Sequence, residues 1–270
     1  MRLTDVSIER NFLYNVGTAE RRLQRLQDQA SSGKLFQRPQ DDPIGVQRSI
    51  HLKHQLAETV QYLRNLDRAR TWMDHVETGL AQVTSALQRV SELALFAVTG
   101  TTPEDAREAV IMEIEEIRQE IDSIERLRIE DKQVLSGPMP TWRVGDQVTV
   151  STDNHAGLFQ DIRTSLDEIV NLLKTDPHGD PIKQTIQDIS DLDDRVLAER
   201  AKNGARIHRI EALESKLQGL DIDFQRMISD VEDVDLTEIL VRLKSAEASY
   251  QAALGAGARL IQPTLLDYLR

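Results

Sequence analysis

The side chains whose types and spacing could support chemistry are few. His51 and His54 lie three positions apart on a predicted helix, close enough to share a metal ion, and His75 follows on the same helix. Metalloprotease helices carry a carboxylate between two histidines, as in HExxH, and this stretch does not. We therefore interpret the three histidines as exposed helix residues and expect no metal site.

Two further features are similar to ligand sites only in part. The segment "GAGAR", residues 255–259, lacks the full glycine motif of a phosphate-binding loop and follows no predicted strand. We interpret Gly255 and Gly257 as positions where the last helix approaches another backbone closely. Trp142 is interpreted as packing under its own hairpin and not as a ligand-stacking residue. The sequence thus predicts no catalytic residue, no cofactor and no enzymatic activity.

The composition favours long helices with narrow seams over a wide globular core. Of the 270 residues, 40% are hydrophobic but only 4% are aromatic, and the formal net charge is -12. The absence of cysteine excludes disulfides and thiolate metal sites. The acidity argues against a nucleic-acid partner, and no window of roughly 18 apolar residues predicts a membrane span. The first residues lack the apolar core of a cleaved signal peptide.

Apolar residues recur in steps of three and four, which is the period of an amphipathic helix. A first helix is predicted to end near Ser31, and a long second helix to run from Pro43 towards Pro103. Residues 141–153 alternate between apolar and polar, so we expect one small exposed β-hairpin there. The expected fold class is mainly α: an elongated helical bundle with paired N- and C-terminal helices and one hairpin.

The stretch "ASSGKLFQRPQDDPIGVQRSI", residues 30–50, interrupts this helical pattern early. Gly33 is suited to end the first helix in a left-handed conformation, and Pro39 prevents the chain from re-entering a helix at once. Asp41 or Asp42 can then cap a new helix that has Pro43 at its first position. The sequence predicts a short linker between two helices.

A second interruption, "SDVEDVD" at residues 229–235, mirrors the first near the other end of the chain. We therefore expect three parts. Residues 1–40 and 236–270 form a terminal-helix inner domain, residues 41–136 and 154–235 form a long-helix bundle, and residues 137–153 form a hairpin insertion. The predicted inter-domain connection comprises Gly33, Pro39, Asp41, Asp42, Pro43, Asp233 and Asp235.

The two ends carry more apolar surface than a pair of helices can bury, so we expect further copies of the chain to cover it. Residues 1–40 have a net charge of +3 and residues 230–270 a net charge of -3, so the two ends can attract each other weakly. The residues predicted to pack between the terminal helices and between subunits are Phe12, Leu13, Val16, Leu23, Leu26, Leu243, Tyr250, Leu254, Leu260, Ile261, Leu265, Leu266 and Leu269.

Two segments resemble a known family. "LQDQASSGKLFQRPQDDPIG" is similar to the segment after the first helix of bacterial flagellin-like proteins, and "MISDVEDVDLTEILVRLKSAEASYQAALGAGARLIQPTLLDYLR" resembles their C-terminal end. Pro43 follows Asp41 and Asp42 where flagellins usually have alanine, and the ending "LLDYLR" differs from the "VLSLLR" typical of flagellins. Both details favour the members of the hook–filament junction over flagellin itself.

The resemblance implies a structural protein that polymerises into a ring between hook and filament. It implies contacts with a neighbouring hook-associated junction protein and with flagellin, and an export chaperone that acts on the C-terminal region. It also implies an extracellular location, in the flagellum, after type III export. Flagellin is the close alternative, an intracellular coiled-coil scaffold is a second, and an enzyme is a third.

Overall fold

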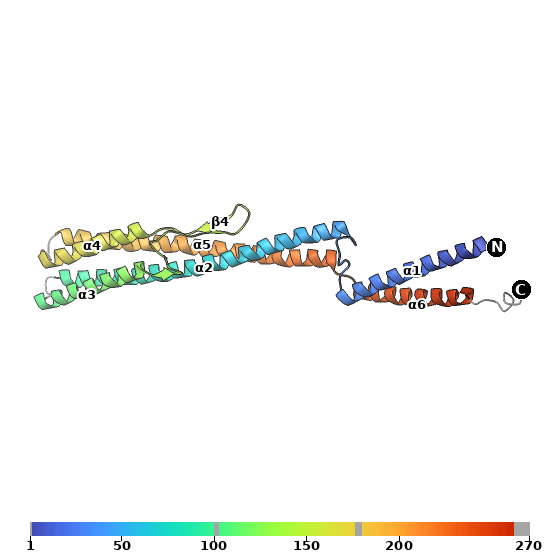
Figure 1. Cartoon of the computed structure of the whole chain (residues 1–270). Coiled ribbons are helices and arrows are strands. Elements are labelled where there is room, and N and C mark those ends of the chain that lie inside the picture. The colour runs from blue at the N-terminus through green and yellow to red at the C-terminus, as the bar shows by residue number, and fades with distance from the viewer. Residues whose placement is uncertain (1, 100–102, 176–179, 262–270) are drawn as a thin grey trace. The chain divides into compact units, whose positions relative to one another are not determined.

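The computed structural model describes residues 2–99, 103–175 and 180–261. These residues form six helices and two small hairpins (Figure 1). The helices are α1 (Arg2–Ser32), α2 (Pro43–Val98), α3 (Glu104–Glu125), α4 (Ala156–Thr175), α5 (Asp180–Glu232) and α6 (Leu236–Ile261). The mainly α fold predicted from the apolar period is confirmed.

The chain divides into two compact units. Unit 1 comprises residues 1–57 and 222–270, and unit 2 comprises residues 58–221. The helices α2 and α5 therefore contribute residues to both units. The three-part division predicted from the sequence stays a prediction.

The main apolar cluster of unit 2 is shared by α2, α3, α4 and α5. On α2 the apolar residues that recur in steps of three and four from Met73 to Ala97 are all buried, and Leu80, Val83 and Leu87 are 0% exposed. Ile114 of α3, Ile162 of α4 and Ile189 of α5 enter the same cluster. The four helices thus bury the stripes that the three-and-four spacing predicted.

Two hairpins connect α3 to α4. Strands β3 (Thr141–Arg143) and β4 (Thr149–Ser151) pair antiparallel, which confirms the predicted hairpin. Strands β1 (Arg128–Ile129) and β2 (Lys132–Gln133) form a second one, so the prediction of a single strand-like stretch was wrong. Its turn residues Glu130 and Asp131 both have positive φ angles, of 47° and 63°.

Trp142 does more than cover the underside of its own hairpin. Its ring lies 6.0 Å from that of Trp72 on α2, at an interplanar angle of 60°. It is half-buried against the main cluster and against a second cluster that contains Leu66, Met73 and Ile210. The edge-to-face contact between Trp142 and Trp72 therefore packs the β3–β4 hairpin against α2.

The apolar side chains of α5 become more exposed towards the C-terminus of the helix. Ile210 and Leu217 are buried, but Met227 is 45% exposed. The helix also continues to Glu232, so the predicted interruption is confined to residues 233–235. A run of acidic residues does not end a helix by itself, because none of them lacks a backbone donor.

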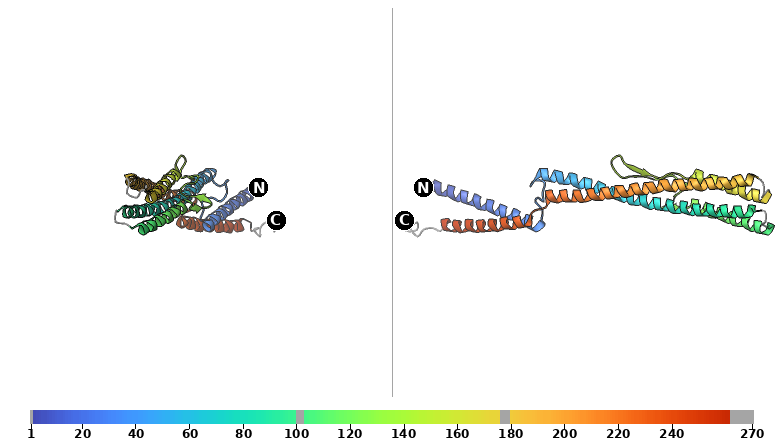
Figure 2. Two further views of the ribbon diagram at one scale, coloured as in Figure 1. Left: turned by 90° about the vertical axis from the view of Figure 1, so that its left-hand side faces the viewer. Right: turned by 180° about the vertical axis from the view of Figure 1, so that it is seen from behind.

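In unit 1 the helices α1 and α6 lie side by side (Figures 1 and 2). Their shared core is small: Leu26, Ile239 and Ala246 are buried, and the apolar residues around them are only half-buried. This pair positions both the predicted packing residues and the connection at residues 33–42.

Candidate assembly surface and connection

The connection begins with a helix stop of the predicted kind. Gly33 has a φ of 70°, and its N–H donates to the carbonyl of Gln29 at 2.9 Å. A side chain at this position would be strained, because L-residues rarely adopt a left-handed backbone. Gly33 thus ends α1 and turns the chain away from its axis.

The connection ends with two aspartates in different roles. The Asp42 carboxylate accepts hydrogen bonds from the N–H groups of Ile44, at 3.2 Å, and Gly45, at 3.0 Å. It is therefore the cap of α2, which begins at Pro43. Asp41 instead accepts the backbone N–H of Arg38 at 3.0 Å and so closes the loop around the exposed Pro39.

The connection pairs with the segment between α5 and α6. Lys34 and Asp233 form an isolated antiparallel bridge. The N–H of Leu35 donates to the Glu232 carbonyl at 2.6 Å, and that of Val234 donates to the Gly33 carbonyl at 3.1 Å. Two interruptions far apart in the sequence therefore satisfy each other's backbone groups.

Asp235 has the same role for α6 as Asp42 has for α2. Its carboxylate accepts the N–H of Thr237 at 2.8 Å and of Glu238 at 3.3 Å. The structure therefore gives a local backbone or hydrogen-bonding role to Gly33, Asp41 and Asp42 at the first interruption and to Asp233 and Asp235 at the second. Their role between domains stays a prediction.

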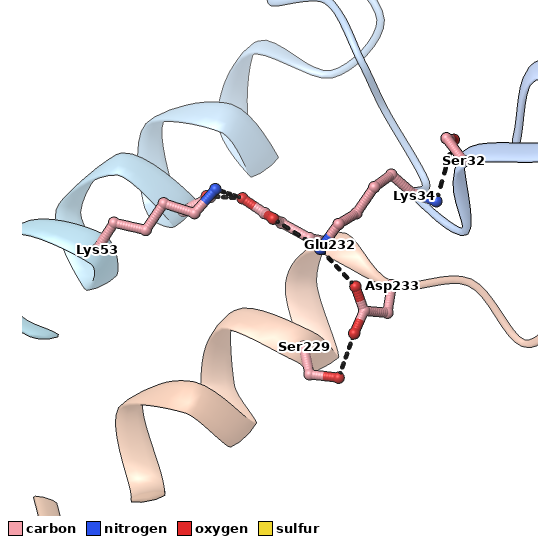
Figure 3. A network of polar contacts seen from close by, with 7 residues as sticks. Ser32, Lys34, Lys53, Ser229, Glu232 and Asp233 are labelled. Atoms are coloured by element: carbon pink, nitrogen blue, oxygen red, sulfur yellow. Dashed lines mark hydrogen bonds and ion pairs between the residues drawn. The ribbon is translucent and has the colours of Figure 1, made fainter. Parts of the chain in front are cut away.

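A group of polar side chains surrounds Glu232, the last residue of α5 (Figure 3). Its carboxylate accepts hydrogen bonds from Lys34, at 3.1 Å, and from Ser49 and Lys53 of α2. Lys34 also donates to Asp233 at 2.7 Å, and Ser229 donates to Asp233 at 2.6 Å. We call these six residues the Glu232 cluster.

The Glu232 cluster was missed in the sequence except for Asp233. Glu232 is only 7% exposed, and Ser49 only 2%. A buried carboxylate that meets two ammonium groups and a hydroxyl is held in one arrangement, because leaving it unpaired costs several kcal/mol. The one available signal was that Lys34 and Glu232 lie within the two interruptions.

The electrostatics of the cluster favour the ionised carboxylates. Burial raises the pKa of Glu232, but hydrogen bonds from Lys53, Ser49 and Lys34 outweigh burial and lower the pKa from 4.5 to about 2. The hydrogen bond from Lys34 lowers the pKa of Asp233. Hydrogen bonds to Asp233 and Glu232 raise the pKa of Lys34.

This shift predicts an acid-sensitive connection. The folded pKa of Glu232 lies below its unfolded value, so its stabilisation is present above pH 4.5 and is lost as the pH falls towards 2. The protection factors of the backbone amides of residues 229–235, which correct for the pH dependence of the intrinsic exchange rate, should fall over this range in the native protein. In Glu232→Gln the protection factors of these amides should already be low at pH 7, so that the two proteins converge near pH 2. A difference that stayed constant with pH would contradict the assignment.

The structure brings part of the predicted packing set together. Leu26 is buried, and Leu23 and Leu243 are half-buried beside it. Phe12, Val16 and Tyr250 are also half-buried. Leu13 and Leu254, by contrast, are 59% and 46% exposed. Leu260 and Ile261 belong to the last turn of α6, and Leu265, Leu266 and Leu269 lie outside the described residues.

Gly257 meets Phe12 where α1 and α6 face each other far from the connection. A β-carbon built on Gly257 would lie 1.9 Å from the Phe12 ring, whereas one on Gly255 would meet nothing. The predicted close approach therefore concerns Gly257 alone, and its partner is a side chain. The aromatic ring fills the space that the glycine leaves.

We expect Gly257→Ala to displace Phe12 and weaken this end of the α1–α6 pair by about 1–2 kcal/mol, because the ring has to move. Gly255→Ala is the matched control and should stabilise α6 by a few tenths of a kcal/mol to about 1 kcal/mol. Proteolysis within residues 10–20 measures the difference. Equal resistance of both variants would show that Phe12 finds another site at no cost.

The described residues contain no group of three histidine, aspartate or glutamate side chains placed to hold a metal ion. Among them, none of the helices is both long enough and apolar enough to cross a membrane. The features that organise unit 1 are a helix pair with exposed apolar residues and a connection held by backbone and side-chain hydrogen bonds. Both are features of packing and assembly.

Comparisons with known proteins agree with this kind of site. The family model of the bacterial flagellin N-terminal helical region matches residues 7–138. A flagellin of Halalkalibacterium halodurans is 24% identical over 274 residues, which cover 99% of this chain and 98% of that flagellin. The chain belongs to the flagellin family, and it is a structural component of the flagellum and not an enzyme.

Within the family, the chain is similar to flagellar hook-associated protein 3 of Escherichia coli. The two are 23% identical over 276 residues, which cover 83% of this chain and 87% of that protein. A solved structure of a flagellar hook-associated protein from Vibrio parahaemolyticus superimposes with a TM-score of 0.65 at 16% identity. It covers 72% of this chain and 100% of that one, and shows that the two share a fold.

Proposed function

We propose that this protein forms the junction between the flagellar hook and the filament. The observation that carries the proposal is the similarity to hook-associated protein 3 over most of both chains. The proline after Asp41 and Asp42 and the ending "LLDYLR" support the same choice over flagellin. In this role the protein polymerises into a ring that contacts a neighbouring hook-associated protein on one side and flagellin on the other.

The unpartnered apolar residues of unit 1 suit such an assembly. Leu13, Leu240 and Val241 are 59%, 53% and 67% exposed, more than a folded monomer needs to leave in water. In the proposed ring these residues, together with the leucines of residues 260–269, pack against neighbouring subunits. The connection around Gly33 and Asp233 joins this inner pair to the outer helices. Export through the type III apparatus, with a chaperone on the C-terminal region, would precede assembly.

Deletion of the gene tests the proposal. Electron microscopy should find hooks without filaments, and unassembled flagellin should accumulate in the medium. Re-expression of the intact chain should restore filaments. Filaments on the deletion strain would contradict a junction role.

Flagellin is the second candidate, because a flagellin matches the chain from end to end. Purified flagellin elongates into filaments when seeded with filament fragments. A junction protein should stay short under the same conditions, so seeded polymerisation distinguishes the two functions.

A further inference from the structure

The charge of the molecule is divided unequally between its units. Residues 58–221 contain 31 acidic and 19 basic side chains, a net of -12, which equals the charge of the whole chain. Unit 1 contains 14 of each and is neutral. Any strongly basic surface on unit 1 is therefore complementary to unit 2 of another copy.

Unit 1 has such a surface. A groove of about 530 Å³ lies between α1 and α6, and side chains of a partner can fill a groove of this size. Its lining includes Arg21, Arg22 and Arg25 of α1 and Arg242 of α6, and no carboxylate. We call it the arginine groove.

The cations of the arginine groove are poorly neutralised. Arg242 pairs with Glu238 at 2.5 Å, and Arg21 donates to the hydroxyl of Thr18 at 3.1 Å. Among the described residues Arg22 and Arg25 have no carboxylate within ion-pair distance. Guanidinium groups in this arrangement favour an anionic partner, because they bind carboxylates with two parallel hydrogen bonds.

The most acidic helix of unit 2 presents the matching surface. Helix α3 carries nine acidic and two basic residues. Glu113, Glu115, Asp122 and Glu125 pair with arginine or lysine of neighbouring helices. Glu108, Glu116 and Glu120 are exposed and, within the described residues, have no ion-pair partner.

These three carboxylates form one line. Glu108, Met112, Glu116 and Glu120 follow at intervals of four, which places them along one ridge that winds gradually around α3. Met112 in this line is 57% exposed. We call it the acidic stripe. From Glu108 to Glu120 it extends roughly 18 Å, and the groove lining from Thr18 to Gln29 extends roughly 16 Å.

We propose that the acidic stripe of one copy docks on the arginine groove of another. The contact is head-to-tail, because it joins different surfaces of two identical chains, and such contacts continue into rings or helices. The proposal deepens the structural role given above and adds the surfaces that set the order of neighbouring subunits. Its charges are exposed, so it acts mainly on the rate and register of docking and weakens with salt.

Disulfide trapping in purified full-length protein tests the contact, and the chain has no cysteine of its own to interfere. Thr18→Cys places one thiol in the groove, and Met112→Cys places one in the stripe. When the two proteins are mixed and oxidised at low salt, the mixed dimer should exceed both homodimers. Its yield should fall about tenfold at 0.5 M salt, where the Debye length is only a few ångströms.

Charge exchange makes the test specific. Arg22→Glu with Arg25→Glu, added to the groove protein, should reduce the mixed dimer about tenfold, because like charges then face each other. Adding Glu108→Arg and Glu116→Arg to the stripe protein should restore it. Arg48 and Glu168 are exposed and lie outside the groove and the stripe, so Arg48→Glu and Glu168→Arg are controls. Neither should change the yield of the mixed dimer. Circular dichroism checks that each variant keeps its helical content.

Three results would overturn the proposal. One is a mixed dimer no more abundant than the homodimers. Another is a yield of mixed dimer that does not change when the charges of the groove or the stripe are reversed. The third is an intrachain disulfide, independent of protein concentration, in a chain with both cysteines. Because these results come from purified protein, they leave the deletion phenotype to decide the junction role separately.

Discussion

Leu87→Asp should unfold the helical bundle of unit 2 or lower its stability by at least 4 kcal/mol, roughly the cost of losing a buried leucine and burying an unpaired charge. Leu87 is 0% exposed and lies within the cluster that all four helices share. The aspartate would have no cation to pair with inside it. Thermal unfolding followed by circular dichroism measures the loss.

Ser85→Asp on the same helix is the matched control, because Ser85 is exposed and donates only to the carbonyl of Ala81. Its melting temperature should stay within a few degrees of the native value, as surface changes usually do. A Leu87→Asp protein that melted like this control would show that the α2 seam does not face the core.

Glu232→Gln should destabilise unit 1 by about 2–3.5 kcal/mol. The upper limit follows from the shift of the Glu232 pKa from 4.5 to about 2, because one pKa unit corresponds to about 1.4 kcal/mol. The glutamine keeps a partner for Ser49 but leaves Lys34 and Lys53 without the charge that they share. Hydrogen exchange at residues 43–53 and 229–235 should increase, while residues 80–95 of unit 2 should exchange as before.

Asp233→Asn is the matched control on the adjacent residue. Asp233 also pairs with Lys34, but its side chain is 43% exposed, so solvent screens the pair. We expect less than about 1 kcal/mol for this change. Equal effects of the two substitutions would mean that burial does not set the strength of the Glu232 cluster.

Local rules were sufficient for the helices and their ends. The period of three and four identified the α2 seam, because each of its residues faces the same core. Gly33 could be assigned, and the cap of α2 narrowed to Asp41 or Asp42, because a left-handed stop and a cap depend only on neighbouring residues.

The same rules failed where the partner is distant or the residue type is unusual. Nothing near Glu232 in the sequence indicates that Lys53 will meet it, 179 positions away. The β1–β2 hairpin turns through Glu130 and Asp131, where glycine or asparagine is the usual signal for positive φ angles. Trp142 could be placed on a hairpin, but its contact with Trp72 needed the fold.

The pairing of α1 with α6 also determines the order in which the protein can be completed during synthesis. Lys34 and Glu232 are separated by 198 positions, and the ribosome adds about 5–20 residues per second. The first helix therefore waits for about 10–40 seconds before its intended neighbour exists. Throughout this interval the apolar side of α1, including Leu23 and Leu26, has no native surface to cover it. Unit 2 lies entirely between the two partners in the chain, so its bundle can close before unit 1 begins to form.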